Sequence, residues 1–224
     1  NYNTFVYSLD YLAPGPAQLN FQTAPFFLAF GGVLFFKEKL NALQLMCFAT
    51  LALGMMLFFH PLINFSQGND NQVWLGVMIV QFSALSWSCY ALLQRILLKA
   101  ISPGNLLLFV YAFGLLAMLP FSDVQSYKVW AMDEWLIIVF CALNTLVAYG
   151  CFAQSMRYWP TVQVGAMIAL TPLISFSSTE LVARLGWWPQ QIHGGVLDGL
   201  AIFGIVLVVV SVLGVQLLPK RHSK

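Results

Sequence analysis

The side chains of this 224-residue chain that could do chemistry are amides, hydroxyls and aromatic rings inside apolar segments. Gln18, Asn20, Gln22 and Thr23 precede Pro25, and the two glutamines share one helix face because they are four residues apart. Pro25 lacks a backbone donor and frees a carbonyl one turn back. These groups could bind a polar solute. The alternative is hydrogen bonding between helices, worth about 0.6 kcal/mol on average.

A second polar stripe has the spacing of one helix face. Ser83, Trp87, Tyr90 and Gln94 stand at i, i+4, i+7 and i+11. Trp87 lies away from the ends of its apolar segment, and its indole N–H needs a partner there. The ring could stack on a solute ring or cation, or it could pack in the core with an interhelical hydrogen bond.

Two further groups complete the candidate substrate pathway. Tyr149 begins a short stripe with Phe152 and Ser155, and small hydroxyl residues follow Thr171-Pro172. Such hydroxyls could face a solute, or they could allow close helix contact and bond to their own backbone. The predicted pathway residues are Gln18, Gln22, Pro25, Ser83, Trp87, Tyr90, Tyr149, Thr171 and Pro172.

No cluster in the sequence predicts catalysis, a cofactor or a metal site. The three histidines stand far apart, the four cysteines form no CxxC pair, and neither GxSxG nor a P-loop occurs. The charged residues lie near the ends of apolar segments, and Glu180 and Arg184 are spaced to pair at i, i+4. The sequence therefore predicts that the protein is not an enzyme.

Membrane-spanning helices are the elements that must position these groups. The chain is 60% hydrophobic and 8% charged, with a mean hydropathy of +0.79, whereas soluble domains are about 25% charged. This composition excludes a soluble enzyme, a nucleic-acid binder and a disordered chain. Residues 1–12 resemble the later part of a further span. Seven segments are long and apolar enough to span: 14–36, 42–59, 74–98, 104–121, 134–156, 161–183 and 195–218.

The basic residues predict the orientation of these spans. With the C-terminal tail placed in the cytoplasm, eight of the ten Lys and Arg residues lie inside, and Lys128 and Arg184 lie outside. Gly195 and Gly199 form a GxxxG pair, which predicts close packing of the last helix. Tryptophans mark the predicted outer ends of spans, as an aromatic belt requires: Trp74, Trp130, Trp135, Trp187 and Trp188.

An internal repeat links the two ends of the chain. Tyr, Phe, Ser and Tyr recur at identical spacing in residues 2–11 and 149–158, and Pro25 matches Pro172 at the same offset. The offset covers five spans, an odd number, so the two copies have opposite orientation. Inverted repeats are typical of secondary transporters. The same count predicts a protein of ten helices, of which two and the start of a third would precede Asn1.

In the order and spacing of its motifs, the chain resembles the drug/metabolite transporter superfamily, specifically EamA-type ten-helix permeases. The resemblance rests on Asn3–Tyr11, on Pro25 followed by Leu34-Phe-Phe-Lys-Glu38, on the 43–59 span with Gly54, on Leu85-Ser-Trp87-Ser-Cys-Tyr90 with Arg95, and on Thr171-Pro172. It implies an all-α polytopic transmembrane bundle of two inverted five-helix repeats around a central cavity. The second repeat departs from the pattern because it lacks a glutamate matching Glu38.

The resemblance also implies a division of the chain. Residues 1–60 would be the remainder of the first EamA-like repeat, and 61–73 an outside loop. Residues 74–218 would be the second repeat, and 219–224 a cytoplasmic basic tail.

Family members mostly export amino acids or related metabolites. The expected function is therefore export of such solutes by alternating access in a bacterial inner membrane. An uptake permease for a sugar or other solute, or a non-transporting assembly or sensor protein, is the alternative. The expected partners are a small-molecule solute and the lipid bilayer, without nucleic acid. Proton coupling stays open, because no carboxylate lies mid-span. Either the coupling group precedes Asn1, or the protein is a uniporter.

Overall fold

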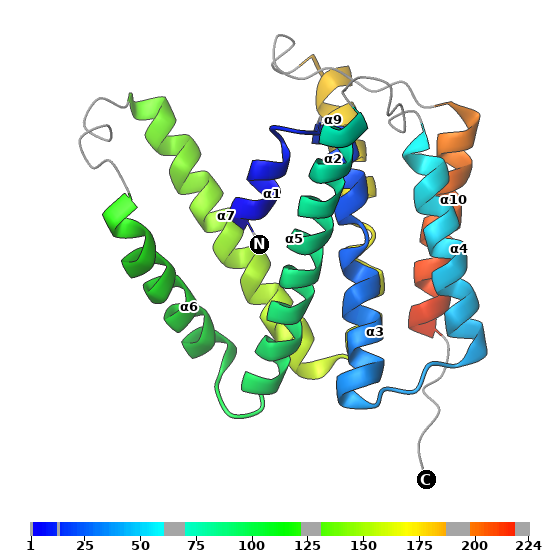
Figure 1. Ribbon diagram of the computed structural model, residues 1–224, viewed down its shortest axis with the longest axis horizontal. Coiled ribbons are helices and arrows are strands. Elements are labelled where there is room, and N and C mark those ends of the chain that lie inside the picture. Colours follow the sequence, from blue (N-terminus) through cyan, green and yellow to red (C-terminus); the bar gives the residue numbers. More distant parts are fainter. Residues whose placement is uncertain (1, 13, 61–69, 122–130, 187–197, 218–224) are drawn as a thin grey trace. The chain divides into compact units, whose positions relative to one another are not determined.

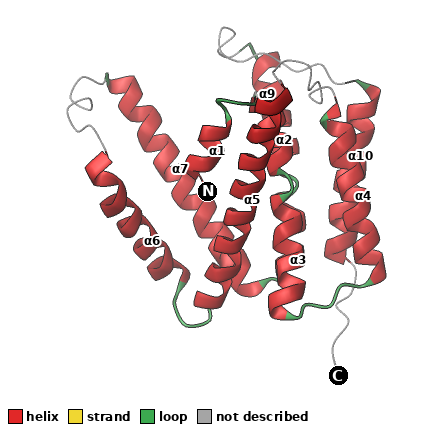
Figure 2. Ribbon diagram, viewed as in Figure 1, coloured by secondary structure: helices red, strands yellow, loops and turns green. Residues whose placement is uncertain are grey.

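Helices make up all the regular structure that the computed structural model describes, which covers residues 2–12, 14–60, 70–121, 131–186 and 198–217 (Figures 1 and 2). The predicted all-α bundle is thus confirmed. Several features of the predicted topology lie outside the described residues: Lys128, Trp130, Trp187, Trp188, Gly195, most of the 61–73 loop and the basic tail.

Among the described residues, six helical segments are long and apolar enough to cross a membrane. Each begins within two residues of the start of a predicted span, except the last, which begins at Gly199. The seventh predicted span, 42–59, forms the 17-residue helix α4 (Ala42–Phe58). At 1.5 Å per residue α4 is about 25 Å long, at the lower limit for a spanning helix. The six segments are Pro14–Phe36, Val73–Leu97, Pro103–Phe121, Glu134–Tyr158, Thr161–Arg184 and Gly199–Leu217.

The contacts of the chain divide it into two compact units, one of residues 1–90 and 160–224 and one of residues 91–159. The second unit contains α6 (Pro103–Met118), the short 3₁₀ helix η2 (Leu119–Phe121) and α7 (Met132–Tyr158). The long helix α5 (Asp70–Leu97) begins in the first unit and ends in the second. The first unit also contains α1 (Tyr2–Ser8), α2 (Pro14–Phe21), α3 (Ala24–Phe36), α4, α8 (Thr161–Ile168), α9 (Thr171–Arg184) and α10 (Gly199–Leu217).

Local hydrogen bonds set where several helices begin. Ser102 precedes Pro103 and its hydroxyl accepts the Asn105 N–H at 3.3 Å, so it is the N-cap of α6. The Gln44 side chain accepts the backbone N–H of Asn41 at 3.1 Å at the start of α4. Glu134 does the same for Ala131 at 2.8 Å at the start of α7. Capping residues in the sequence therefore fix these helix boundaries.

α4 and α10 pack antiparallel along their length, side by side in Figure 1. The close contact depends on Gly54 and Gly204, because a Cβ on Gly204 would lie 2.5 Å from the Phe58 nitrogen and 2.7 Å from the Gly54 carbonyl oxygen. The close packing predicted for the last helix is present, but Gly204 provides it and Gly199 does not, because a Cβ on Gly199 would meet no described atom within 4 Å. Gly199 begins the helix, whereas Gly204 lies one turn further along and faces α4.

Two of the predicted spans are broken near the middle, at the prolines that the sequence pairs. The span 14–36 forms α2 and α3 with Gln22-Thr23 between them, and the span 161–183 forms α8 and α9 with Ala169-Leu170 between them. Both segments begin, break and resume at positions 147 residues apart, from Pro14 to Thr161 and from Ala24 to Thr171. α3 packs antiparallel against α8, so the two broken segments have the opposite orientation that the inverted repeat requires.

Candidate functional site

The first helix break is held by a side chain from α5. The Gln81 amide nitrogen donates to the Asn20 carbonyl at 3.1 Å, and its amide oxygen accepts from the Thr23 hydroxyl at 2.9 Å. One amide therefore bonds to both sides of the break. Backbone groups freed at a break inside a membrane must be satisfied by a neighbouring helix, a water or a solute. Gln81 supplies that partner at this site.

α5 makes two further contacts with the broken segment. The buried Ser88 hydroxyl lies 3.0 Å from the Ala24 carbonyl and 2.9 Å from the Ala84 carbonyl of its own helix, so its single proton is shared between them. The Trp87 ring meets Phe21 edge to face, with 6.5 Å between ring centroids. Trp87 thus packs against the last residue of α2, beside the break.

The predicted pathway residues of α2 and α3 differ in exposure. Gln18 is exposed, Pro25 is buried, and Gln22 is 7% exposed. The Gln22 amide nitrogen donates to the Gln18 carbonyl at 3.3 Å, within the same helix. In this conformation Gln18 therefore offers a reachable amide, and the Gln22 side chain is turned toward its own backbone.

The predicted stripe on α5 lies partly inside the first unit. Ser83 is fully buried, and Trp87 and Tyr90 are half-buried. Gln94, in the second unit, is 2% exposed, and both of its amide atoms are buried without a hydrogen-bond partner. Ser83, Trp87 and Tyr90 thus belong to the unit that contains the two helix breaks, and Gln94 does not.

The remaining predicted residues are divided between the two units. Thr171 is exposed and Pro172 is buried at the start of α9, beside the second break. Tyr149 is half-buried on α7 and belongs to the second unit. The pairing predicted for Glu180 and Arg184 is confirmed, because the Arg184 Nε donates to the Glu180 carboxylate at 2.8 Å.

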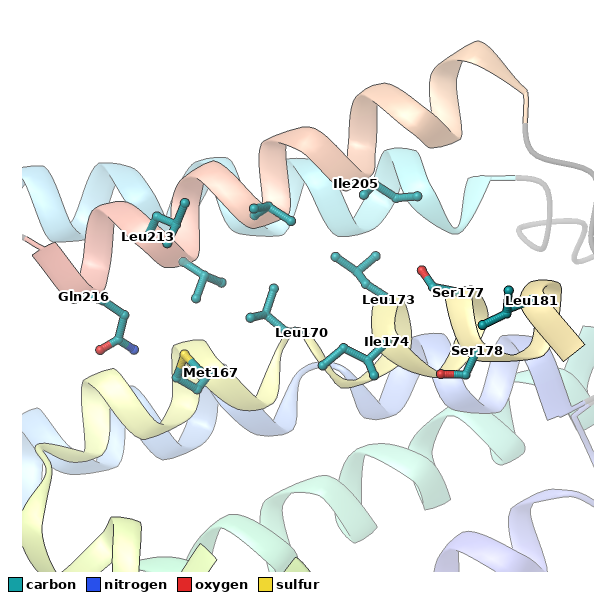
Figure 3. Close-up of a pocket in the computed structure, with 12 residues that line it drawn as sticks. Met167, Leu170, Leu173, Ile174, Ser177, Ser178, Leu181, Ile205, Leu213 and Gln216 are labelled. Carbon is teal, nitrogen blue, oxygen red and sulfur yellow. The ribbon is translucent and has the colours of Figure 1, made fainter. Parts of the chain in front are cut away.

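A groove of about 540 Å³ runs beside the second break, between α8–α9 and α10 (Figure 3). Leu170 and Leu173 line it from one side, and Ile205 and Leu213 face them from α10. Its polar atoms come from Ser177, Ser178 and Gln216. The surroundings of the second break are therefore mainly apolar, in contrast to the amide and hydroxyl groups around the first.

Four residues that make contacts in the two broken segments were not among the predicted pathway residues: Gln81 and Ser88 beside the first break, and Glu38 and Thr161 where α3 ends and α8 begins. Gln81, Ala84 and Ser88 form an i, i+3, i+7 stripe on α5, so helical periodicity was an available signal for Gln81 and Ser88. Glu38 stood out in the sequence as a family motif, yet nothing local indicated that Thr161 is its partner.

Apolar spanning helices, two of them broken at matching positions and the first break bridged by Gln81 of α5, define an integral membrane protein of the transporter class. The model of the EamA-like transporter family matches residues 74–217, and the chain belongs to this family. It is therefore a multi-pass membrane transporter that handles a small-molecule solute in a lipid bilayer.

Two relatives agree with this assignment, and a solved structure shares the fold. An uncharacterized transporter of Haemophilus influenzae is 28% identical over 99% of this chain and 73% of its own length. The uncharacterized inner membrane transporter YhbE of Escherichia coli K12 is 29% identical over 95% of this chain, which spans 66% of that relative. One crystal structure has the same fold, with a TM-score of 0.73 and 18% identity over 96% of this chain and 73% of that one.

Proposed function

We propose that the protein exports amino acids or related small polar metabolites by alternating access, with the two broken helices, α2–α3 and α8–α9, at its centre. The observation that carries this proposal is the pair of breaks at one offset in antiparallel segments. Interrupted helices at corresponding positions of two halves are the best sequence-level indication of a transporter's binding region.

The chemistry around the first break favours a polar solute. Gln18 is exposed on α2, and the amide of Gln81 and the hydroxyl of Thr23 lie at the break itself. These groups both donate and accept hydrogen bonds, so they fit an amino or carboxyl group. Trp87 and Phe21 place aromatic surface beside them for an apolar part of the solute. The proposed pathway residues of the first unit are Gln18, Gln22, Pro25, Ser83, Trp87, Tyr90, Thr171 and Pro172. Tyr149, in the second unit, stays a predicted pathway residue.

Transport by the full-length protein in liposomes tests the proposal. We expect saturable movement of radiolabelled amino acids, faster in the direction that corresponds to export. Gln18→Ala and Trp87→Ala should each lower kcat/KM about tenfold, because each removes contact with the solute. Gln44→Ala and Trp74→Ala are matched controls, since Gln44 caps α4 and Trp74 is an exposed ring near the start of α5.

Distinct results would contradict distinct parts of the proposal. If no amino acid moves but a sugar does, the substrate class is wrong. If Gln18→Ala and Trp87→Ala transport as well as their controls, the assignment of the pathway is wrong. Faster movement in the uptake direction would contradict export.

We also propose that the C-terminus lies in the cytoplasm, as the basic residues favour. Two exposed positions of the second unit test this orientation. Lys99 follows the predicted span 74–98 on the proposed cytoplasmic side, and Ala131 precedes the predicted span 134–156 on the proposed outer side. In a variant without the native cysteines, we expect Lys99→Cys to be protected from an impermeant thiol reagent added to intact cells and Ala131→Cys to react. The reverse labelling pattern would invert the proposed topology.

A further inference from the structure

α3 and α8 cross at a short distance because glycine occupies both helices at the points of contact. A Cβ on Gly165 of α8 would lie 2.7 Å from the Pro25 carbonyl oxygen, and a Cβ on Gly32 of α3 would overlap the Thr161 hydroxyl. Neither position has room for a larger residue without moving a helix. The crossing therefore joins the two broken segments directly.

A carboxylate links the two helices where α3 ends and α8 begins. Glu38 Oε1 accepts the Thr161 N–H at 3.0 Å, and its Oε2 accepts the Thr161 hydroxyl at 2.8 Å and the Val162 N–H at 3.2 Å. We call this set of three hydrogen bonds the Glu38 cap.

The Glu38 cap satisfies donors that α8 cannot satisfy by itself. The residue before α8 is Pro160, and no side chain of its own segment caps the helix. The first N–H groups of a helix have no partner within the helix and carry its positive dipole end, so an anion there is favoured. A carboxylate from the turn that follows α3, more than 120 residues away in the chain, takes the place of a local cap.

The end of α3 directs Glu38 toward α8. Lys37 adopts a left-handed conformation with φ 53°, and the backbone N–H groups of Lys37 and Glu38 both bond to the Gly32 carbonyl. This turn ends the helix and turns the next residue away from the helix axis. Gly32 thus allows the close contact with Thr161 and also anchors the turn that carries Glu38.

The equivalent crossing of α2 and α9 has none of these features. At the offset of 147, Leu185 corresponds to Glu38, Pro14 to Thr161, and Thr179 and Gln18 to the two glycines. α2 and α9, whose residues are all described, share at most isolated contacts, whereas α3 packs along α8. The two ends of the paired broken helices are therefore unequal in packing and in polar contacts.

We propose that the Glu38 cap holds the transporter closed at the end of the crossing where α3 finishes and α8 begins, here called the α3 end. The Glu38 cap must break for the protein to open at the α3 end. Glu38 acts as a positioning residue, because its carboxylate bonds to the first residues of α8 and so holds α8 against α3. The proposal rests on the alternating access of the proposed function. The conformation in the structure is the one closed at this end.

Two introduced cysteines at equivalent positions of the two crossings test the proposal in the full-length protein without native cysteines. Ala166→Cys on the buried side of α8 reports on the α3 end, and Leu19→Cys, its counterpart on α2, reports on the opposite end. We expect Glu38→Gln to speed thiol labelling about tenfold at the first position and to slow it at the second, since the amide weakens charge-assisted hydrogen bonds. Thr161→Val should have a smaller effect in the same direction, because the two backbone donors remain.

Glu134→Gln is the matched control, because Glu134 also caps a helix start but within its own helix α7. It should leave both labelling rates unchanged. Equal labelling in Glu38→Gln and the parent, or faster labelling at both positions, would overturn the proposal, since the second result indicates general loosening. These rates need no known substrate, so failure of transport with opposite shifts in labelling would contradict the proposed function and retain the Glu38 cap.

Discussion

Gly204→Leu is expected to separate α4 from α10 and to lower the stability of the folded protein by about 3 kcal/mol. The new side chain would meet backbone atoms, Phe58 N at 2.5 Å and Gly54 O at 2.7 Å from its Cβ, and backbone cannot move aside as a flexible side chain does. Val208, fully buried at the same contact, would lose its packing as the helices part. A fall in Tm of purified protein in detergent measures the effect.

Gly199→Leu is the control for this change, because it makes the same substitution on the same helix. A Cβ at Gly199 meets nothing within 4 Å, and the residue is exposed. Its Tm should stay within experimental error of the parent, or rise slightly, since leucine is a better helix former than glycine. If the two variants have equal Tm values, α4 and α10 do not approach as closely as the structure shows.

Gln81→Leu is expected to lower transport by tenfold or more while leaving the protein in the membrane. Leucine has nearly the volume of glutamine but no polar atoms, so the Asn20 carbonyl loses one donor and the Thr23 hydroxyl loses its acceptor on α5. The Thr23 hydroxyl still donates to the Asn20 carbonyl, so the variant loses the two interhelical hydrogen bonds, each worth about 0.5–1.5 kcal/mol. The break between α2 and α3 would therefore change its geometry where we propose that solute binds.

A matched change elsewhere separates this effect from a general loss of polarity. Gln154→Leu alters an exposed glutamine of α7 in the second unit and should transport normally. The initial rate of solute uptake into liposomes, corrected for the amount of inserted protein, is the measurement. Normal transport by Gln81→Leu would show that the bridge across the break is dispensable.

Composition and periodicity were sufficient to predict the helices, because a membrane leaves few alternatives to long apolar segments. The spans 14–36 and 161–183 were predicted without a break, and the structure interrupts each of them just before its paired proline. Pro25 and Pro172 cannot donate the backbone hydrogen bond that a continuous helix needs at that position. The boundaries followed from local chemistry, as at Ser102-Pro103, where hydroxyl and imino acid together start a helix.

Contacts between distant segments could not be predicted in the same way. Glu38 and Thr161 are separated by more than 120 residues, and nothing within either segment specifies the other. In the sequence, nothing distinguishes Gly54 and Gly204 from the other glycines of apolar segments, because their contact depends on the register of α4 against α10. The role of Gln81 could not be predicted without knowing that α5 lies beside the first break. Helix pairing and register, rather than helix formation, carry this information.

The unequal crossings have a consequence for kinetics. If the empty carrier rests mostly in the conformation closed at the α3 end, solute arriving from that side must wait for a minor population, and its apparent affinity falls by the fraction that is competent. The half-saturation concentration should then be higher on that face than on the opposite one. The maximal rates must differ in the same ratio, because a carrier without an energy source cannot shift the equilibrium distribution of its solute. One carboxylate on one side would thus make the carrier kinetically asymmetric without making it a pump.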